Sequence, residues 1–286
     1  MALDFVVFNV KRGLSVFVRT PNNYGLLIDC GCSDLGSPVE QVAAVRLSTW
    51  NNCHLAGFVL SHPHSDHLAD VELLDRKIRP SIVWRRTDLD WAKVVSSNRT
   101  LDELNYYSTH FCNAASYPVQ NPPQPHWGGD FSMHVTWLNA ASVEKVSAQD
   151  NAYVNNSSVV VLLRYVGYTF AVLGDIESEG MTALLQQNTA FATAVSCGVD
   201  FLVCPHHGLA SGYSCDWFEL TGPTRKFNIV SEGSYSEQTI DSRYSCAEAS
   251  AAGNREQRRM VTTRHDGNIR VSIHDNRQWS WRAFDW

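Results

Sequence analysis

Three histidines and an aspartate lie together in the segment His62-Pro63-His64-Ser65-Asp66-His67. In an extended chain, residues i and i+2 point to the same side, so His62 and His64 can bind one metal ion. Asp66 and His67 then fall at the turn into a helix, where they can reach a second ion beside the first. Imidazole and carboxylate groups are suitable ligands for zinc, and also for manganese or iron. Paired ions of this kind make water nucleophilic near neutral pH, so the segment predicts hydrolytic metal chemistry.

Two other polar clusters follow apolar segments that have the composition of buried strands. Asp175 ends the segment at residues 168–175, and the pair His206-His207 follows residues 201–204. Side chains that leave the ends of strands in a rigid sheet project into a common region. The three clusters together therefore predict one metal centre. A polar loop with incidental histidines would explain one cluster but not this repeated placement.

The segments that must position these side chains alternate between strand and helix patterns. Helix starts are predicted at Ser37-Pro38-Val39-Glu40 and Thr100-Leu101-Asp102-Glu103, and helical spacing covers residues 68–76 and 180–187. Alternating or apolar stretches predict strands at residues 5–10, 15–18, 25–29, 56–60, 81–84, 131–138, 158–163, 168–173, 201–204, 227–230 and 269–273. Strands and helices follow in the same order in both halves. We therefore expect two sheets with helices outside them, a four-layer α/β sandwich that forms a single domain over residues 1–286.

The charge of the chain argues against a broad electrostatic attraction to nucleic acid. The formal net charge is −6, and only five of the 23 basic residues are lysines. A local basic groove stays possible, and its candidates are Arg85-Arg86 and residues 255–259, although short arginine runs are more often solvated surface.

Cysteine usage and hydropathy indicate the compartment. The eight cysteines are scattered without any Cys-x-x-Cys pair, which favours reduced thiols over a zinc ribbon or a disulfide framework. No run of about 18 apolar residues is present, and the first residues lack the pattern of a secretory signal. We expect a cytoplasmic protein with no membrane segment.

The motifs together make the chain similar to the metallo-β-lactamase superfamily, and more similar to its ComEC-type competence hydrolase branch than to its antibiotic-degrading branch. The superfamily's histidine motif is present at His62 to His67, after an apolar strand that ends in Asp29. The branch signature has three parts, which are present as Asn155-Asn156-Ser157-Ser158-Val159, Gly174-Asp175 and Pro205-His206-His207-Gly208. The resemblance covers most of the chain and implies the four-layer αββα sandwich of that superfamily.

The resemblance also implies roles for the site residues, with one or two divalent ions, zinc or manganese, as cofactors. His62 and His64 would bind the first metal ion, Asp66 and His67 the second, and Asp175 would bridge them. His207 would complete the second site, while His206 would contact a substrate oxygen or protonate the leaving group; these two roles can also be reversed. The histidine that usually completes the first site is missing, and Asn155-Asn156-Ser157 occupies its region.

The ligand residues by themselves imply hydrolysis, and the resemblance implies a phosphodiesterase or nuclease that acts on nucleic acid or a nucleotide ester. Asp66 would then orient the nucleophile and accept its proton. Two alternatives stay open: a hydrolase of carboxylic esters, lactones or amides, and a non-catalytic scaffold subunit with the same fold. A nuclease in its own cytosol would need restraint, so a regulatory protein partner is possible, and the sequence leaves the oligomeric state open.

Overall fold

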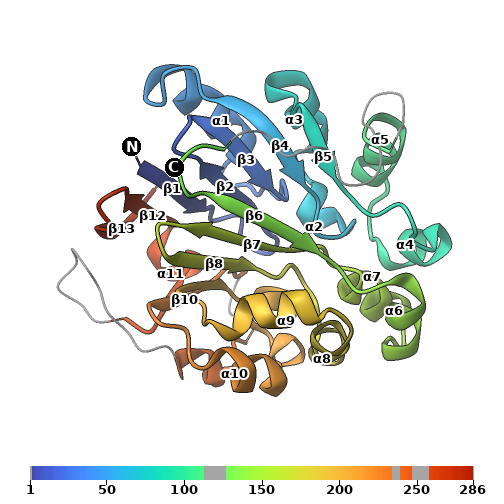
Figure 1. The fold of residues 1–286 in the computed structure, drawn as a ribbon. Helices are drawn as coiled ribbons and strands as arrows, with labels where there is room; N and C mark the ends of the chain where they lie inside the picture. Colours follow the sequence, from blue (N-terminus) through green and yellow to red (C-terminus); the bar gives the residue numbers. More distant parts are fainter. Residues whose placement is uncertain (1, 113–126, 234–238, 247–257, 286) are drawn as a thin grey trace.

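Two β-sheets pack face to face and carry helices on their outer surfaces (Figure 1). The computed structural model describes residues 2–112, 127–233, 239–246 and 258–285. Helices α1 and α3 lie above the first sheet in this view, and α8, α9 and α10 lie below the second. The predicted four-layer α/β sandwich is confirmed.

The first sheet brings the end of one parallel strand beside the end of the next. Its seven strands among the described residues have the order β13-β12-β1-β2-β3-β4-β5. Their bounds are β1 Ala2–Val7, β2 Val16–Arg19, β3 Tyr24–Ile28, β4 His54–Val59, β5 Ile82–Trp84, β12 Asn268–His274 and β13 Trp279–Phe284. Strands β3, β4 and β5 are parallel, whereas β1, β2, β12 and β13 pair antiparallel with their neighbours. The residues that follow β3 and β4 therefore lie at one edge of the sheet.

The second sheet repeats this arrangement. In the described part of the chain it has six strands in the order β11-β10-β9-β8-β7-β6. Their bounds are β6 Ser132–Thr136, β7 Val160–Tyr165, β8 Tyr168–Val172, β9 Phe201–Val203, β10 Phe227–Val230 and β11 Met260–Thr262. Strands β8 to β11 are parallel, so Asp175, His207 and Ser231 follow neighbouring strand ends.

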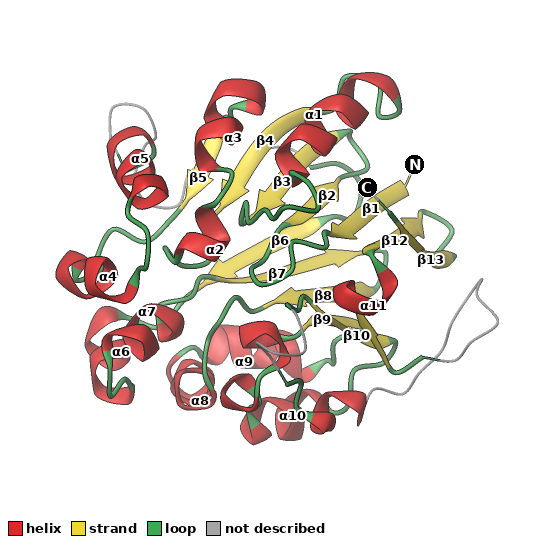
Figure 2. Ribbon diagram, turned by 180° about the vertical axis from the view of Figure 1, so that it is seen from behind, coloured by secondary structure: helices red, strands yellow, loops and turns green. Residues whose placement is uncertain are grey.

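The helices cover the outer faces of the sheets and one edge of the sandwich (Figure 2). Their bounds are α1 Pro38–Ser48, α2 Ser65–Leu68, α3 Val71–Ile78, α4 Trp91–Ser97, α5 Asp102–His110, α6 Ala140–Val146, α7 Asp150–Asn156, α8 Ser178–Gln187, α9 Thr189–Ser196, α10 Cys215–Thr221 and α11 Thr263–Asp266. Helices α4 and α7 pack against each other at the edge where the strands end. Among the described residues, no helix combines the length and the apolar character needed to cross a membrane.

The strand alternation produces two apolar layers. Phe5 of β1 faces the second sheet, where its ring stacks on Phe170 of β8 with the centroids 4.7 Å apart. Its neighbour Val6 points the other way and belongs to the cluster that packs under the helices with Val42 of α1. A period of two in each strand therefore fills the space between the sheets and the space below the helices at once.

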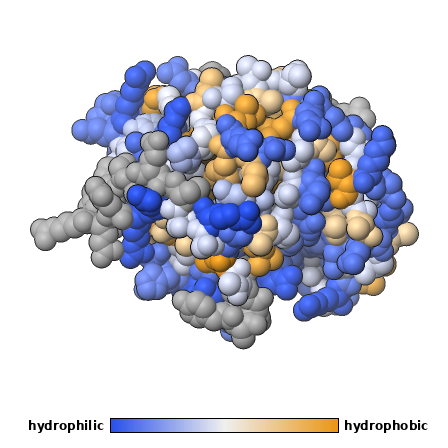
Figure 3. Space-filling view, turned by 90° about the horizontal axis from the view of Figure 1, so that it is seen from below, coloured by the Kyte–Doolittle hydropathy of each residue, from blue (hydrophilic) through white to orange (hydrophobic). Residues whose placement is uncertain are grey.

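The surface is of mixed polarity. On the face shown in Figure 3, apolar residues lie among hydrophilic ones. Among the residues that the structure describes, the exposed large apolar side chains come from several elements: Leu35, Leu47, Trp91, Val95, Leu101 and Leu220. Single exposed apolar residues of this kind are common in globular proteins. The cysteines that the structure describes with their side chains are free thiols, whereas the side chain of Cys246 lies outside the described part.

Several predicted elements differ from the observed ones. The helix predicted over residues 68–76 is broken into α2 and α3, because Cys30 N donates to His67 O at 2.9 Å and Asp70 N donates to Cys30 O at 2.8 Å. The prediction of a capping box at Thr100 is wrong. Helix α5 begins at Asp102, and the Thr100 hydroxyl donates to the Glu103 carboxylate and not to a backbone group of the helix. The Ser37 cap is confirmed: its hydroxyl accepts from the Glu40 amide at 3.0 Å.

Candidate metal centre

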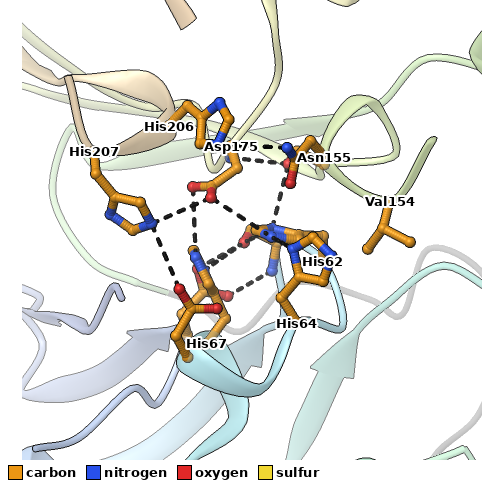
Figure 4. Close-up of polar contacts among 12 residues, drawn as sticks. His62, His64, His67, Val154, Asn155, Asp175, His206 and His207 are labelled. Carbon is orange, nitrogen blue, oxygen red and sulfur yellow. Dashed lines mark hydrogen bonds and ion pairs between the residues drawn. The ribbon is translucent and has the colours of Figure 1, made fainter. Parts of the chain in front are cut away.

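The ends of β4, β8 and β9 bring the three polar clusters to one place. Figure 4 shows His62, His64, His67, Asp175 and His207 turned toward one another, with Asp175 in the middle. His62 follows β4, Asp175 follows β8 and His207 follows β9. The parallel pairing within each sheet is what places these segments at one edge of the sandwich. The strand ends thus assemble the side chains that the sequence singled out.

One side of the cluster is formed by His62 and His64. The His62 Nε2 atom lies 3.0 Å from His64 Nδ1, so these two ring nitrogens converge as expected from their i, i+2 spacing. His62 Nε2 also lies 3.8 Å from Asp175 Oδ2. The other nitrogen of His62, Nδ1, lies 3.0 Å from the Ser61 hydroxyl and 3.4 Å from the Ser158 hydroxyl, which fix the ring.

The other side of the cluster is formed by Asp66, His67 and His207. The His67 Nε2 atom lies 3.4 Å from Asp175 Oδ1, and the His207 Nε2 atom lies 3.2 Å from Asp175 Oδ2. His207 Nε2 also lies 3.9 Å from Asp66 Oδ2. Asp66 and His67, predicted at the turn into a helix, both lie within the short helix α2. Asp175 is therefore within reach of donors on both sides.

Burial and the neighbouring carboxylates together decide the protonation of the histidines. Burial lowers the pKa of His62 well below its ordinary value and lowers the pKa of His64 to about 4. Burial also acts to lower the pKa of His67, but the Asp175 and Asp29 carboxylates raise it well above its ordinary value. Neutral imidazole is the form that binds metal. His62 and His64 are thus in their ligand form at neutral pH, and the carboxylates around His67 make its position strongly favourable for a cation.

The two carboxylates of the cluster are ionised in spite of their burial. Burial acts to raise the pKa of Asp175, but His207, His67 and His62 hold it well below its ordinary value. Burial likewise acts to raise the pKa of Asp66, and His67 and His207 lower it below the ordinary value. One ionised carboxylate buried among imidazoles and a second at the rim of the cleft form a donor set of the kind that divalent ions bind.

These residues fit a metal centre by their geometry. The potential ligand atoms of His62, His67 and Asp175 lie within 4.8 Å of one another, and so do those of Asp66, His67 and His207. His67 belongs to both groups, and His64 joins through its contact with His62. The buried His67 Nε2 atom has no hydrogen-bond partner among the described residues, which an ion between these donors would satisfy. The donor set suits a divalent cation such as zinc or manganese.

Asp29 binds His67 and Ser61 and so supports the candidate metal centre. It was not among the predicted site residues. Its Oδ2 atom accepts from His67 Nδ1 at 2.7 Å and from the Ser61 hydroxyl at 2.6 Å, while its Oδ1 atom accepts from the Ser61 amide at 2.6 Å. Asp29 is fully buried and has a φ of 56°. The signal that points to it in the sequence is a carboxylate directly after the apolar strand at residues 25–28.

A strained turn separates the roles of the two neighbouring histidines. His206 and His207 both have left-handed backbones, with φ values of 49° and 56°. Consecutive non-glycine residues in this region are uncommon and concentrate at functional sites. The turn sends the His207 ring into the cluster, where its Nδ1 lies 3.2 Å from Ser231 O. The His206 ring lies at the cleft instead, with its Nδ1 2.8 Å from the Ser211 hydroxyl.

A cleft of about 330 Å³ opens beside the donor groups. Its lining consists of Arg12, His64, Ser65, Asp66, Ser97, Asn98, Arg99, Asn151, Asn155, Asp175, Glu177 and His206. All of the described residues that line it are polar or charged. Arg12, Arg99 and Glu177 were not predicted as site residues, because no spacing in the sequence connects them to the histidine motif. Asn155 was noted only as part of the branch signature, without a role in the site.

The basic segments that the sequence offered as a nucleic-acid groove do not line this cleft. Arg85 and Arg86 are buried, and the Arg86 guanidinium donates to the carbonyls of Leu138 and Ser157. The interpretation of this pair as surface is therefore wrong, since both arginines join segments of the interior. Residues 255–257 lie outside the described residues.

Comparison with known proteins gives one family. A family model described as the metallo-beta-lactamase superfamily matches residues 9–215. No curated protein shows significant sequence similarity to this chain.

Similar solved structures share little sequence with the chain. The metallo-beta-lactamase fold protein YhfI from Bacillus subtilis is 14% identical, with 86% of this chain and 80% of that chain covered and a TM-score of 0.35. Zn(2+)-bound PqqB from Methylobacterium extorquens is 12% identical, with 82% and 89% covered and a TM-score of 0.43. CmlA from Streptomyces venezuelae, a diiron beta-hydroxylase, is 15% identical, with 70% and 34% covered and a TM-score of 0.38.

Proposed function

The chain belongs to the metallo-beta-lactamase superfamily, and we propose that it is a metal-dependent phosphodiesterase or nuclease that acts on nucleic acid or a nucleotide ester. The observation that carries this proposal is the composition of the cleft beside the metal centre. The described residues that line it are all polar, and two of them are arginines. Small-molecule pockets are usually lined mainly by apolar and aromatic side chains. A polar lining with cations suits phosphate and sugar groups better than the apolar part of an ester, lactone or β-lactam.

The two arginines are placed where they can bind phosphate oxygens. The Arg12 Nε atom lies 3.4 Å from Asp66 Oδ2, so its guanidinium stands at the rim of the donor group with its side chain half exposed. Arg99 is exposed and forms no ion pair with any described residue. Guanidinium groups bind phosphate in a bidentate manner that a carbonyl substrate does not require.

The position of Arg99 is fixed by its neighbour in the chain. The Asn98 side chain accepts from the Ser65 amide at 2.8 Å and donates to Pro63 O at 2.9 Å. These two bonds connect the end of α4 to the segment that carries His64 and Asp66. Arg99 is thereby held beside the ligand segment, although it is more than thirty residues away in sequence.

The chain's own groups can then take up the proton of the attacking water and contact the substrate. A divalent ion at this centre supplies Lewis acidity and acidifies water. Asp66 is ionised and lies at the rim of the cleft, where it can orient an attacking water and accept its proton. Burial lowers the pKa of His206, so its imidazole is neutral at neutral pH and can contact a substrate oxygen. The Ser211 hydroxyl orients this ring.

The experiment that tests the proposal compares substrates on protein loaded with Mn²⁺ or Zn²⁺. We expect nitrophenol release from bis-nitrophenyl phosphate and none from a nitrophenyl carboxylic ester or a β-lactam. Linear and circular DNA, RNA and cyclic dinucleotides then identify the preferred ester. The His64→Ala variant is the control for contaminating nuclease. Hydrolysis of the carboxylic ester alone would overturn the proposal.

A further inference from the structure

We propose that Asn155 is a ligand of the first metal ion, through its side-chain oxygen. It would complete a donor set formed by His62 Nε2, His64 Nδ1 and Asp175 Oδ2, adding a neutral oxygen to two imidazoles and one carboxylate. Asn155 is the last residue but one of α7 and lines the same cleft as His64 and Asp175. This inference concerns metal binding and holds whichever ester the protein cleaves.

The Asn155 side chain is buried and its oxygen lacks a partner. The residue is 4% exposed, and Oδ1 makes no hydrogen bond with any described residue. Buried amide oxygens almost always have a partner, so one without any calls for a group that the protein chain does not supply. Figure 4 shows Asn155 beside Asp175, on the side of the cluster that holds His62 and His64, with His207 on the other side.

The orientation of the amide is decided by Glu177. The Asn155 Nδ2 atom donates to Glu177 Oε1 at 2.9 Å, and a carboxylate can only accept hydrogen bonds. The nitrogen must therefore face Glu177, and the oxygen must face away from it. The same Nδ2 lies 3.5 Å from His206 Nε2, so both of its neighbours are on the nitrogen side.

Glu177 is itself held in place by the next residue of the helix. The Glu177 amide donates to Asn156 Oδ1 at 2.9 Å, and Asn156 Nδ2 donates to the Ser147 hydroxyl at 3.2 Å. Asn156 is fully buried. Asn155 therefore binds the Glu177 side chain, and Asn156 binds the Glu177 backbone. These two contacts fix the end of α7 relative to the segment that follows Asp175.

The chain that follows Asn155 already supports the first donor set. The Ser158 hydroxyl accepts from the Asp175 amide at 3.0 Å and lies 3.4 Å from His62 Nδ1. The segment from Asn155 to Ser158 therefore contacts two donors of this set through one residue and presents an unpartnered oxygen through another. A ligand in this segment is supported by the same contacts that orient the other donors.

The kind of ligand determines which ion the first site prefers. Imidazole suits zinc, whereas carbonyl and carboxylate oxygens suit manganese and magnesium. With two imidazoles, one carboxylate and one amide oxygen, the first site would bind zinc less tightly than a site with three imidazoles. We therefore expect two unequal sites, of which the first holds its ion more weakly and exchanges it more readily.

The test measures metal binding by the metal-free protein with Mn²⁺ and with Zn²⁺, using titration calorimetry and the metal content after desalting. We expect the wild-type protein to bind two Mn²⁺ ions per chain with different affinities. In Asn155→Ala the weaker site should lose about tenfold or more in Mn²⁺ affinity, with the tighter site unchanged. In Asn155→His the second Zn²⁺ ion should survive desalting.

Asn151→Ala is the matched control, because Asn151 lies one turn earlier on α7, lines the same cleft and is exposed. It should bind both ions as the wild type does. Wild-type affinity of Asn155→Ala for both ions would overturn the inference, and so would the absence of any gain in Zn²⁺ retention in Asn155→His. Circular dichroism of each variant shows whether it is folded. A phosphodiesterase assay that fails while these binding results hold would reject only the proposed function.

Discussion

The Nδ1 atom of His67 lies 2.7 Å from Oδ2 of Asp29, and both side chains are completely buried. Since a carboxylate only accepts, Nδ1 of His67 must carry the proton in this bond. Nε2 is then free of its proton in the neutral ring and faces Asp175, which lies 3.4 Å away. Asp29 therefore selects the tautomer of His67 that can bind a metal ion.

Asp29→Asn should weaken metal binding about 10-fold to 100-fold. Asparagine keeps the size of the side chain and tolerates the left-handed backbone at this position. Its amide, however, must place an NH₂ group against either the Ser61 amide or His67 Nδ1, both of which donate to Asp29. Titration of the metal-free protein with Zn²⁺ measures the loss. Asp34→Asn, on an exposed ion pair with Lys11, should bind as the wild type does, and equal affinities for the two variants would contradict the role of Asp29.

Gly174→Ala should reduce stability and metal binding together. Gly174 has a φ of 60°, and a Cβ atom there would lie 2.8 Å from Ser158 Oγ and 2.9 Å from Ser61 Cβ. These two serines hold His62 and Asp175, so the displacement reaches the donors directly. A left-handed alanine costs about 1–2 kcal/mol, and the overpacking adds about 1–3 kcal/mol.

Gly167→Ala separates these two effects. Gly167 has a φ of 93° in the turn between β7 and β8, and a Cβ atom there would meet nothing within 4 Å. Gly167→Ala should therefore lose only the stability that a left-handed alanine costs, and the variant should keep the metal affinity of the wild type. Urea denaturation and Zn²⁺ titration of both variants give the comparison, and intact metal binding by Gly174→Ala would mean that the serines do not transmit the displacement.

Arg99→Ala should raise the KM for bis-nitrophenyl phosphate about tenfold, because a charge-assisted hydrogen bond contributes about 1.5 kcal/mol. Arg99→Lys should recover part of the loss, since lysine keeps the charge but not the bidentate geometry. Steady-state kinetics on metal-loaded protein measure both. Arg282→Ala, an exposed arginine on β13 outside the cleft, is the control. An unchanged KM in Arg99→Ala would remove this residue from substrate binding.

Asp4→Ala should lower the free energy of unfolding by about 3 kcal/mol at pH 7, because it leaves two arginines without the carboxylate that they share. Asp4 is buried and accepts from Arg19 and Arg270 at 2.6 Å each. Burial acts to raise its pKa, but Arg270, the Ser272 hydroxyl and Arg19 hold the pKa below its ordinary value.

The pH dependence of this effect follows from the direction of the shift. A pKa that is lower in the folded state stabilises the protein above the pKa of the unfolded chain, and the stabilisation disappears as the pH falls through the folded-state value. The difference between the wild type and Asp4→Ala should thus be constant from pH 6 to pH 8 and shrink below about pH 4. Urea denaturation at several pH values measures it. Asp34→Ala removes only an exposed ion pair with Lys11, so its difference from the wild type should be small at every pH. A constant difference between the wild type and Asp4→Ala down to pH 3 would contradict the assignment.

The elements and ligand types were predictable because their signals are local. Most sheet strands show their period of two or their apolar run within a few residues, although β11 and β13 were not among the predicted strands. His62, His64, Asp66 and His67 stand close together in the sequence. The positions of Asp175 and the His206-His207 pair at strand ends were also visible. A parallel arrangement of those strands then brings them to one edge. The type of chemistry is therefore determined by the sequence alone.

The short helices could not be predicted in the same way. Helix α7 has the sequence Asp150-Asn-Ala-Tyr-Val-Asn-Asn156, which has no strong helix period, and it is stabilised by packing against α4. The break between α2 and α3 depends on hydrogen bonds from residues 30 and 70 across the fold. Tertiary contacts decide such elements because a short helix is marginal by itself.

What only the tertiary structure decided is which distant side chains support and surround the metal centre. Asp29 reaches His67 from 38 positions away, and Asn155 meets Glu177 from 22 positions away. Arg12 and Arg99 reach the cleft from two unrelated loops. No spacing rule relates such residues, since their distances depend on the register of parallel strands and on how helices pack at the sheet edge. The sequence alone therefore determined the candidate ligand types, and packing determined the tautomer of His67, the orientation of the Asn155 amide and the charge of the cleft.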